Sequence, residues 1–261
     1  MKIFFKLFLF IVCVFSQSMI SQTLTISASG ETGTSGKNWL ISKDLPSHIM
    51  VYGDVHLSKT LIEDLLSIGQ EVKIISENNI VIADKIFLDA MAFSHLSIEA
   101  KNDIVFLKSS ELTSSNPVNL NFFAGKSISI HKSAKLKSRG GDITLQAYHS
   151  FQILKKNPES SLTIEGVVDA SSQDIGGKVI ITADEILLSK KAKILSKGFN
   201  GGGKILIGGD WQGGALAEMK ELEDIYEAMA VTVEKGVVID ASATIRGNGG
   251  KVVVWSNINH P

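Results

Sequence analysis

A short pattern, apolar–any–apolar–any–small, recurs along this chain at a nearly constant interval. It starts at Val72, Leu96, Leu120, Ile143, Val179, Ile205 and Val252. The steps are 24, 24, 23, 36, 26 and 47 residues, the last of them close to two periods. Less clearly framed copies at Leu24 and Ile49 extend the register upstream. Alternation puts every second residue on one face, and one repeat of this length cannot bury that face alone, so the repeats must stack on one another.

A second alternation follows each early copy, beginning four residues after the small residue. Its apolar pairs are Ile80 and Ile82, Ile104 and Phe106, Ile128 and Ile130, and Phe151 and Ile153. Each coil therefore has two or three short strands, joined by corners of constant length. The pattern predicts an all-β chain forming a single parallel β-helix of about ten coils, about 45–50 Å long.

Glycine pairs precede the later repeats, at Gly140-Gly141, Gly176-Gly177, Gly202-Gly203 and Gly249-Gly250. We expect these pairs to supply positive φ angles at the sharpest bend of each coil. The stretch Gly198 to Lys204 also satisfies G-x-x-x-x-G-K, the spacing of a phosphate-binding loop, but Ile205 stands where that motif needs a hydroxyl for Mg²⁺. Because Lys178 and Lys251 follow glycine pairs in the same way, we interpret the stretch as a repeated corner with solvated lysines. No cofactor is predicted.

The N-terminal segment has the features of a secretory signal peptide. Two lysines precede an apolar core, residues 7–15, that is too short to span a bilayer, and Ser16–Ser18 offers a cleavage site. We therefore predict a signal peptide over residues 1–21 and a β-helix over 22–261. The single cysteine, Cys13, lies in the signal segment, so no disulfide is expected. With 26 basic and 27 acidic residues, the charge gives no indication of a nucleic-acid partner.

One segment, residues 217–229, has helical rather than strand spacing of its apolar residues. We predict a short helical insertion there that packs on the outside of the rod. Tryptophans that flank the insertion and the last repeat are expected at outward or corner positions, where a sugar could stack on them, with covering by the helix as the simpler alternative. The candidate ligand or partner surface comprises Trp211, Trp255, Met219, Leu222 and Tyr226.

Three segments carry a resemblance to a known family: GGKVIITADEILL, GFNGGGKILIGGDWQGG and VTVEKGVVIDASATIRGNGGKVVVWSN, within residues 176–257. Together they resemble the repeat region of filamentous-haemagglutinin-type exoproteins of the two-partner secretion class. The resemblance implies a right-handed parallel β-helix, secreted or held at the surface of a Gram-negative bacterium. It also implies export by an outer-membrane transporter partner, and action as an adhesin or stalk that meets a glycan or protein receptor. The asparagine-proline motifs usual in that family's secretion domain have only a poor and misplaced counterpart, at Asn116-Pro117.

The repeat stops soon after Ser256, which predicts strand edges without a covering segment. Two expectations follow: truncation of the β-helix at its C-terminal end, or self-association or docking through an exposed last coil. A non-functional fragment of a longer exoprotein gene is a further alternative.

A carbohydrate-active β-helix enzyme, either a polysaccharide lyase or a hydrolase, is the main alternative to an adhesin. Its best carboxylates are Asp169 and Asp240, 71 residues apart at equivalent positions. We expect them about three coils, or about 14 Å, apart, which is too far for a pair of carboxylates that acts on one bond. A turn aspartate that bonds its own backbone is the expected role of each. The six histidines show no metal-ligand spacing, so no catalytic or metal site is predicted.

Basic residues gather in the middle of the chain and are expected to form a stripe if the coils stack in register. They are Lys126, Lys132, Lys135, Lys137, Arg139, Lys155, Lys156, Lys190, Lys191 and Lys193. Lysines at strand edges and corners commonly prevent pairing with other chains, and that is the role we expect here, with contact to an acidic glycan as the alternative.

Overall fold

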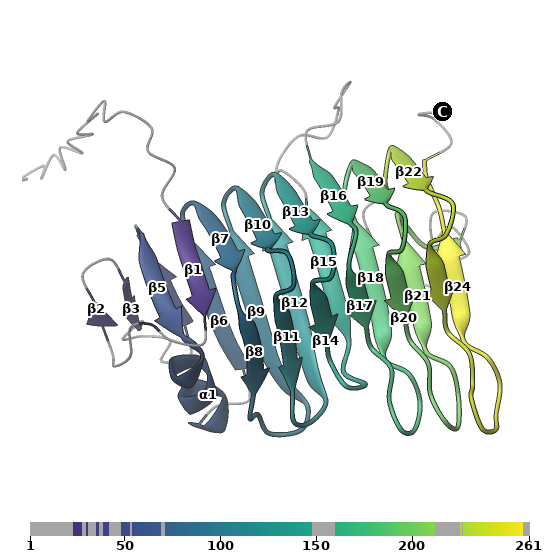
Figure 1. Ribbon diagram of the computed structural model, residues 1–261, viewed down its shortest axis with the longest axis horizontal. Helices are drawn as coiled ribbons and strands as arrows, with labels where there is room; N and C mark the ends of the chain where they lie inside the picture. The colour runs from purple at the N-terminus through teal and green to yellow at the C-terminus, as the bar shows by residue number, and fades with distance from the viewer. Residues whose placement is uncertain are drawn as a thin grey trace, which may run out of the picture.

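The computed structural model is an elongated stack of coils built from three sheets (Figure 1). It describes residues 23–27, 30, 35–36, 39–41, 48–52, 54–68, 71–147, 160–211, 225 and 227–257. The segment predicted as a signal peptide lies outside these residues. Successive strands pass from one sheet to the next, and strands of successive coils pair in parallel, so the predicted all-β parallel β-helix is confirmed.

Each complete coil gives one strand to each sheet, in the same order. The ten-stranded sheet runs β2 (Ser35–Gly36), β3 (Trp39–Ile41), β4 (His48–Val51), β6 (Glu71–Ser76), β9 (Ser94–Ala100), β12 (Val118–Ala124), β15 (Ile143–Ala147), β18 (Lys178–Thr182), β21 (Lys204–Ile207) and β24 (Lys251–Val254). The eight-stranded sheet runs β22 (Ala230–Val233), β19 (Glu185–Leu188), β16 (Ser161–Ile164), β13 (Ser127–Ile130), β10 (Asp103–Phe106), β7 (Asn79–Ile82), β1 (Thr23–Ser27) and β5 (Val55–Ser58). The six-stranded sheet runs β23 (Val238–Asp240), β20 (Lys193–Leu195), β17 (Val167–Asp169), β14 (Lys135–Lys137), β11 (Glu111–Ser114) and β8 (Lys85–Leu88).

The predicted aliphatic columns lie inside the coils. All seven starting residues of the main pattern, from Val72 to Val252, are direct neighbours in the ten-stranded sheet. The second column is also in register, with Ile104 between Ile80 and Ile128 in the eight-stranded sheet. Between the sheets, Phe106 and Phe122 pack edge to face with ring centroids 5.2 Å apart, a favoured aromatic geometry. One continuous core therefore fills the rod.

The number of coils is smaller than the repeat spacing suggested. Within the described residues, the sheets share six complete coils, which begin at β6, β9, β12, β15, β18 and β21, rather than about ten. The step of 47 residues is one coil with an insertion and not two periods, because β21 pairs directly with β24. The step of 36 residues is also a single coil, because β16 pairs directly with β13 and places Leu162 beside Ile128. The strand predicted at Phe151 and Ile153 lies outside the described residues.

The upstream extension of the register is wrong in two places. Leu24 lies in the eight-stranded sheet, beside Ile80 and Val55, so β1 does not belong to the column of Val72. Ile49 is in the expected sheet but pairs with Ile74, two residues further along β6. A period of two is unchanged by a shift of two residues, so alternation alone does not distinguish these registers.

The one helix of the described residues, α1 (Lys59–Ile68), lies beside the first coils and was not predicted from the sequence. Ser58 accepts a hydrogen bond from the Thr60 amide at 3.2 Å, as a helix N-cap does. Ile62 and Leu66, four residues apart on one helix face, are buried in the core. Nowhere in the described chain does a helix combine the length and hydropathy needed to cross a bilayer.

Most of the helix predicted at 217–229 lies outside the described residues, and Glu227–Met229, which are described, are not helical. Within that segment, Ile225 packs against an outward-facing cluster of Ile180, Leu206 and Val253 on the ten-stranded sheet. This contact agrees with the expectation that the insertion covers the outside of the rod.

Most glycines of these pairs serve close packing rather than positive φ, and Gly249 is an exception, with no atom within 4 Å of a Cβ. Of these glycines only Gly140 has a left-handed backbone, with φ of 101°. At Gly203, a Cβ atom would overlap the hydroxyl of Ser196 and the carbonyl oxygen of Gly177 in the coil below. Left-handed residues occur instead at the corner between the eight- and six-stranded sheets, where Ser133 has φ of 65° and Lys191 has φ of 75°. The expectation of positive φ at the pairs was therefore wrong apart from Gly140.

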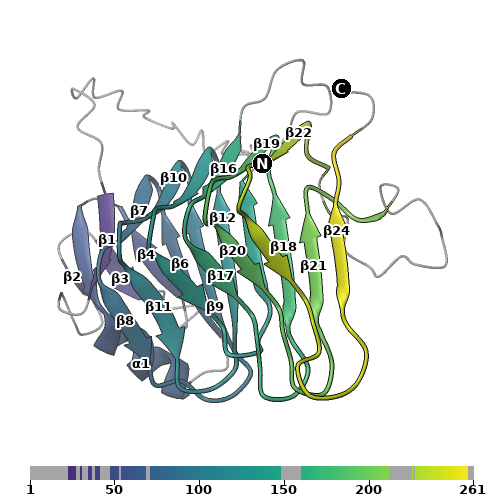
Figure 2. The ribbon, with the colours of Figure 1, turned by 45° about the vertical axis from the view of Figure 1, so that its right-hand side comes forward.

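The last described coil, which begins at β24, has inward-facing valines that are exposed. Val252 and Val254 are 45% and 44% exposed, whereas Ile205, which occupies the position of Val252 one coil earlier, is fully buried. Figure 2 shows β24 at the end of its sheet. Self-association through this coil stays a prediction.

Candidate functional site

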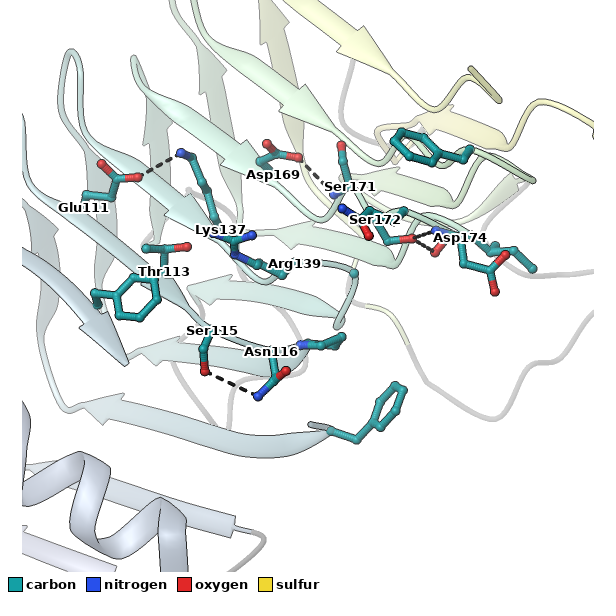
Figure 3. A pocket seen from close by; sticks show the side chains of 17 residues that line it. Glu111, Thr113, Ser115, Asn116, Lys137, Arg139, Asp169, Ser171, Ser172 and Asp174 are labelled. Carbon is teal, nitrogen blue, oxygen red and sulfur yellow. Dashed lines mark hydrogen bonds and ion pairs between the residues drawn. The ribbon is translucent and has the colours of Figure 1, made fainter. Parts of the chain in front are cut away.

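A groove of about 960 Å³ follows the outer face of the six-stranded sheet (Figure 3). Its floor is formed by side chains at the outward positions of four neighbouring strands: Phe87 on β8, Glu111 and Thr113 on β11, Lys137 on β14 and Asp169 on β17. They point outward because the alternate residues of the same strands are buried in the core. The groove therefore follows directly from the stacking of coils in register.

One wall of the groove consists of the corners that lead from the six-stranded to the ten-stranded sheet. These corners become longer toward the C-terminus, from residues 115–117 to residues 170–177 and 196–203. The long corners lie side by side (Figures 1 and 2) and are joined by an isolated bridge between Ile175 and Gly201. Asn200 also donates to Asp174 Oδ1 at 2.9 Å. Hydrogen bonds between the corners thus hold this wall in place.

Apolar side chains are exposed at both ends of the groove. Phe87 and Phe93 lie toward the N-terminal coils and are 48% and 69% exposed, and Ile175 and Phe199 lie toward the C-terminal coils at 60% and 41%. Large apolar side chains that gather on a surface commonly mark an interaction site. These residues were not predicted from the sequence. The only signal for them is phenylalanine at an outward strand position or inside a glycine-rich corner.

The charged side chains on the floor are held by local partners. Lys137 Nζ lies 2.8 Å from Glu111 Oε1, and Lys135 Nζ lies 3.8 Å from Glu111 Oε2. The hydrogen bond from Lys137 holds the pKa of Glu111 below its ordinary value of 4.5, and the charges of Lys137 and Lys135 add to this effect, outweighing burial. Glu111 is therefore ionised at neutral pH, and part of the predicted basic stripe is neutralised.

A first prediction concerns pH. A carboxylate with a depressed pKa in the folded state contributes stability above its unfolded pKa, and this contribution disappears as the pH falls through the folded pKa. We expect Lys137→Met to lower the free energy of unfolding at pH 7 by about 0.5 kcal/mol, because the pair is partly exposed. The difference from wild type should vanish in acid below the depressed pKa of Glu111. Urea unfolding at several pH values measures it, with Lys132→Met at an exposed corner as the control, and a difference that persists in acid would contradict the assignment.

The two candidate catalytic aspartates are closer than predicted. Asp169 and Asp240 both lie beside Leu195, so they are two coils apart rather than three, because an insertion within one coil lengthens their separation in sequence. Their predicted role in turns is confirmed: Asp169 accepts from the Ser171 amide at 2.9 Å, and Asp240 from the Ser242 amide at 3.0 Å. A hydrogen bond from the Ser242 side chain holds the pKa of Asp240 below its ordinary value. Such a group is unsuited to donate a proton at neutral pH.

The phosphate-loop interpretation is disfavoured by the geometry. Gly202 N donates to Asn248 O of the next coil at 3.0 Å and Gly203 N donates to Ser196 O of its own corner at 2.8 Å, so both amides are already hydrogen-bonded within the rod. Lys204 and Lys251 are not simply solvated, because their Nζ atoms lie 3.7 and 2.7 Å from carboxylate oxygens of Asp210. The repeated-corner interpretation agrees with these contacts.

The candidate surface chosen from the sequence is only partly brought together, and it lies away from the groove. Trp211 and Trp255 are neighbours, with ring centroids 6.4 Å apart, and Trp255 packs against the outward-facing cluster on the ten-stranded sheet. Met219, Leu222 and Tyr226 lie outside the described residues. A role of this surface in binding stays a prediction.

Fold and site together define a parallel β-helix with a lateral groove that is polar along its floor and apolar at its ends. Comparison with known protein families, with characterised proteins and with solved structures gives no match. Within the described part of the chain, no three His, Cys, Asp or Glu side chains are grouped so that they could hold a metal ion. A function must therefore be inferred from the groove itself.

Proposed function

We propose that this chain is an exported surface protein that binds an extended glycan along the groove of the six-stranded sheet, without catalysis. The observation that carries the proposal is the exposure of Phe87, Phe93 and Phe199 in one groove whose floor presents hydrogen-bonding groups. Sugar rings have an apolar face that packs on aromatic rings. Their hydroxyl groups require donors and acceptors, which Thr113 and Asn116 among others supply.

Two other extended ligands fit the groove less well. A peptide that adds a strand to a sheet needs an unpaired strand edge, but β11, β14 and β17 in the floor are paired on both sides, and a strand added beside the edge strand β8 would run parallel to the strands and not across them along the groove. Single-stranded nucleic acid binds where a row of aromatic side chains stacks successive bases along the groove, whereas the exposed rings here lie at the two ends of the groove and the floor between them is polar.

The proposal includes export and a place at the cell surface. It is supported by the signal-peptide features of residues 1–21 and by the family resemblance of residues 176–257, which also motivate an outer-membrane transporter as an export partner. Within this proposal the rod is an adhesin or stalk, and its receptor is a glycan on a host or neighbouring cell.

The test is binding of the purified protein to a panel of polysaccharides, measured by calorimetry. We expect Phe93→Ala with Phe199→Ala to weaken binding at least about tenfold, which corresponds to about 1.4 kcal/mol. Trp211→Ala, which removes an exposed aromatic ring outside the groove, should leave binding unchanged and serves as the control.

Two results would contradict the proposal. Loss of binding in Trp211→Ala alone would move the site to the surface chosen from the sequence. Release of reducing or unsaturated sugars during incubation would favour the carbohydrate-active enzyme instead.

A further inference from the structure

Among the charged side chains that line the groove, Arg139 alone has no partner in the described part of the chain. It lies at the corner between β14 and β15, and Figure 3 shows its side chain in the middle of the groove lining. Lys137 pairs with Glu111, whereas the exposed guanidinium of Arg139 makes no hydrogen bond or ion pair with any part of the chain that the structure describes. A permanently charged group with five donors is thus directed to solvent inside a groove.

The backbone at this corner places the arginine in an uncommon conformation. Arg139 has φ of 56° and is followed by Gly140 with φ of 101°, so two successive residues are left-handed. This region is uncommon for a residue that has a Cβ atom. The pair makes a tight turn at the edge of the groove floor, and Ser172 of the next coil would touch a Cβ at Gly140. The turn that carries Arg139 is therefore packed closely against the next coil at Gly140.

Arg139 also lies midway along the groove. The lining runs from β8, which carries Phe87, to the corner after β20, which carries Phe199. With β11, β14 and β17 between them, β8 and β20 make up five neighbouring strands of the six-stranded sheet. These five strands span about 19 Å, and β14 is the central one. An extended ligand that reaches both apolar ends must pass Arg139.

We infer that Arg139 is an anion-binding subsite and that the ligand of the groove is an acidic glycan that carries a carboxylate on a sugar between the two apolar ends. A guanidinium binds a carboxylate through two parallel hydrogen bonds, a geometry that an ammonium group cannot provide. This inference rests on the proposed function, because it names the class of glycan that the same groove takes.

The test compares three polymers on wild type and Arg139→Gln: polygalacturonate, its methyl ester, and dextran sulfate. Wild type should bind polygalacturonate more tightly than the neutral ester. Arg139→Gln should weaken binding of polygalacturonate about tenfold and leave binding of the ester unchanged. Lys132→Gln, at an exposed corner outside the groove lining, is the matched control. If Arg139→Gln affects only dextran sulfate, the carboxylate assignment is overturned in favour of a sulfated ligand.

Failure of the inference and failure of the proposed function give different results. If Arg139→Gln leaves every affinity unchanged while Phe93→Ala with Phe199→Ala weakens binding, Arg139 is no subsite but the glycan groove stands. If none of the three polymers and no member of the wider polysaccharide panel binds, both fail. Arg139→Gly, which accepts the same φ without strain, replaces Arg139→Gln should that variant misfold by circular dichroism.

Discussion

Replacing Phe122 by alanine is expected to lower the free energy of unfolding by about 4 kcal/mol, the largest effect of any single change considered. Phe122 is fully buried inside the rod, between Ile98 and Leu145 of the neighbouring coils and edge to face with Phe106. Its removal would leave a cavity in a column where each side chain supports the coils above and below it. Guanidinium unfolding followed by far-UV circular dichroism measures the effect.

The matched control is Phe123→Ala, because Phe123 is the next residue of the same strand, β12, and points to the outer face. It removes the same atoms from a partly exposed site, so we expect a cost below about 1 kcal/mol. Equal losses at both positions would mean that β12 does not separate an inner from an outer face, and the β-helix assignment would be wrong.

Gly203→Ala should destabilise the protein by about 3 kcal/mol, the second-largest effect. The added methyl group would overlap the carbonyl oxygens of Gly176 and Gly177 and the hydroxyl of Ser196, which itself donates to Gly177 O. Most of these atoms belong to the backbone and cannot rotate away. Two coils would have to separate at the corner that also carries Phe199 in the groove wall.

Gly249→Ala provides the comparison within the same series of corners. No atom lies within 4 Å of a Cβ at Gly249, and this glycine has no positive φ. We expect the free energy of unfolding of Gly249→Ala to stay within about 0.5 kcal/mol of the wild-type value or to rise slightly, since alanine reduces the entropy of the unfolded chain. A similar loss in Gly203→Ala and Gly249→Ala would show that coil contacts do not explain the glycine pairs.

Rigidity of the groove bears directly on its proposed use. The floor residues Glu111, Lys137 and Asp169 extend from strands that pair with neighbours on both sides, and the corner with Asp174 is bonded to Asn200 of the next one. A site that is already ordered loses little conformational freedom when a ligand binds. An extended, flexible polymer loses conformational freedom of its own when it binds. A groove that adds little further loss therefore favours its recognition.

Much of the fold was predictable from the sequence because aliphatic alternation with a constant step has few physical solutions. The column from Val72 to Val252 and the second column at Ile80, Ile104 and Ile128 were assigned correctly, including their register. The errors lie where an insertion interrupts the repeat or where the copies of the pattern are less distinct. Leu24 was placed in the wrong sheet, the 47-residue step was read as two periods, and α1 was missed.

The candidate site was much less predictable. Trp211 and Trp255 were chosen because tryptophan at an outward position is a plausible sugar platform, and the structure places them together on the ten-stranded sheet. Phe87, Phe93 and Phe199 are separated by up to 112 residues in the chain and share a groove only through coil stacking. No local pattern connects them. Likewise, only the contacts among the described residues identify Arg139 as the groove cation that has no partner there.

By itself the sequence determined that the chain coils and which side chains face inward, since burial of alternating apolar residues is a local property repeated at a fixed period. Tertiary structure alone decided how many coils there are, which corners touch, and which outward residues line one groove. These features depend on how insertions are accommodated between paired strands and on contacts between backbones, as at Gly203 and Gly177. Neither leaves a periodic signal in the order of residues.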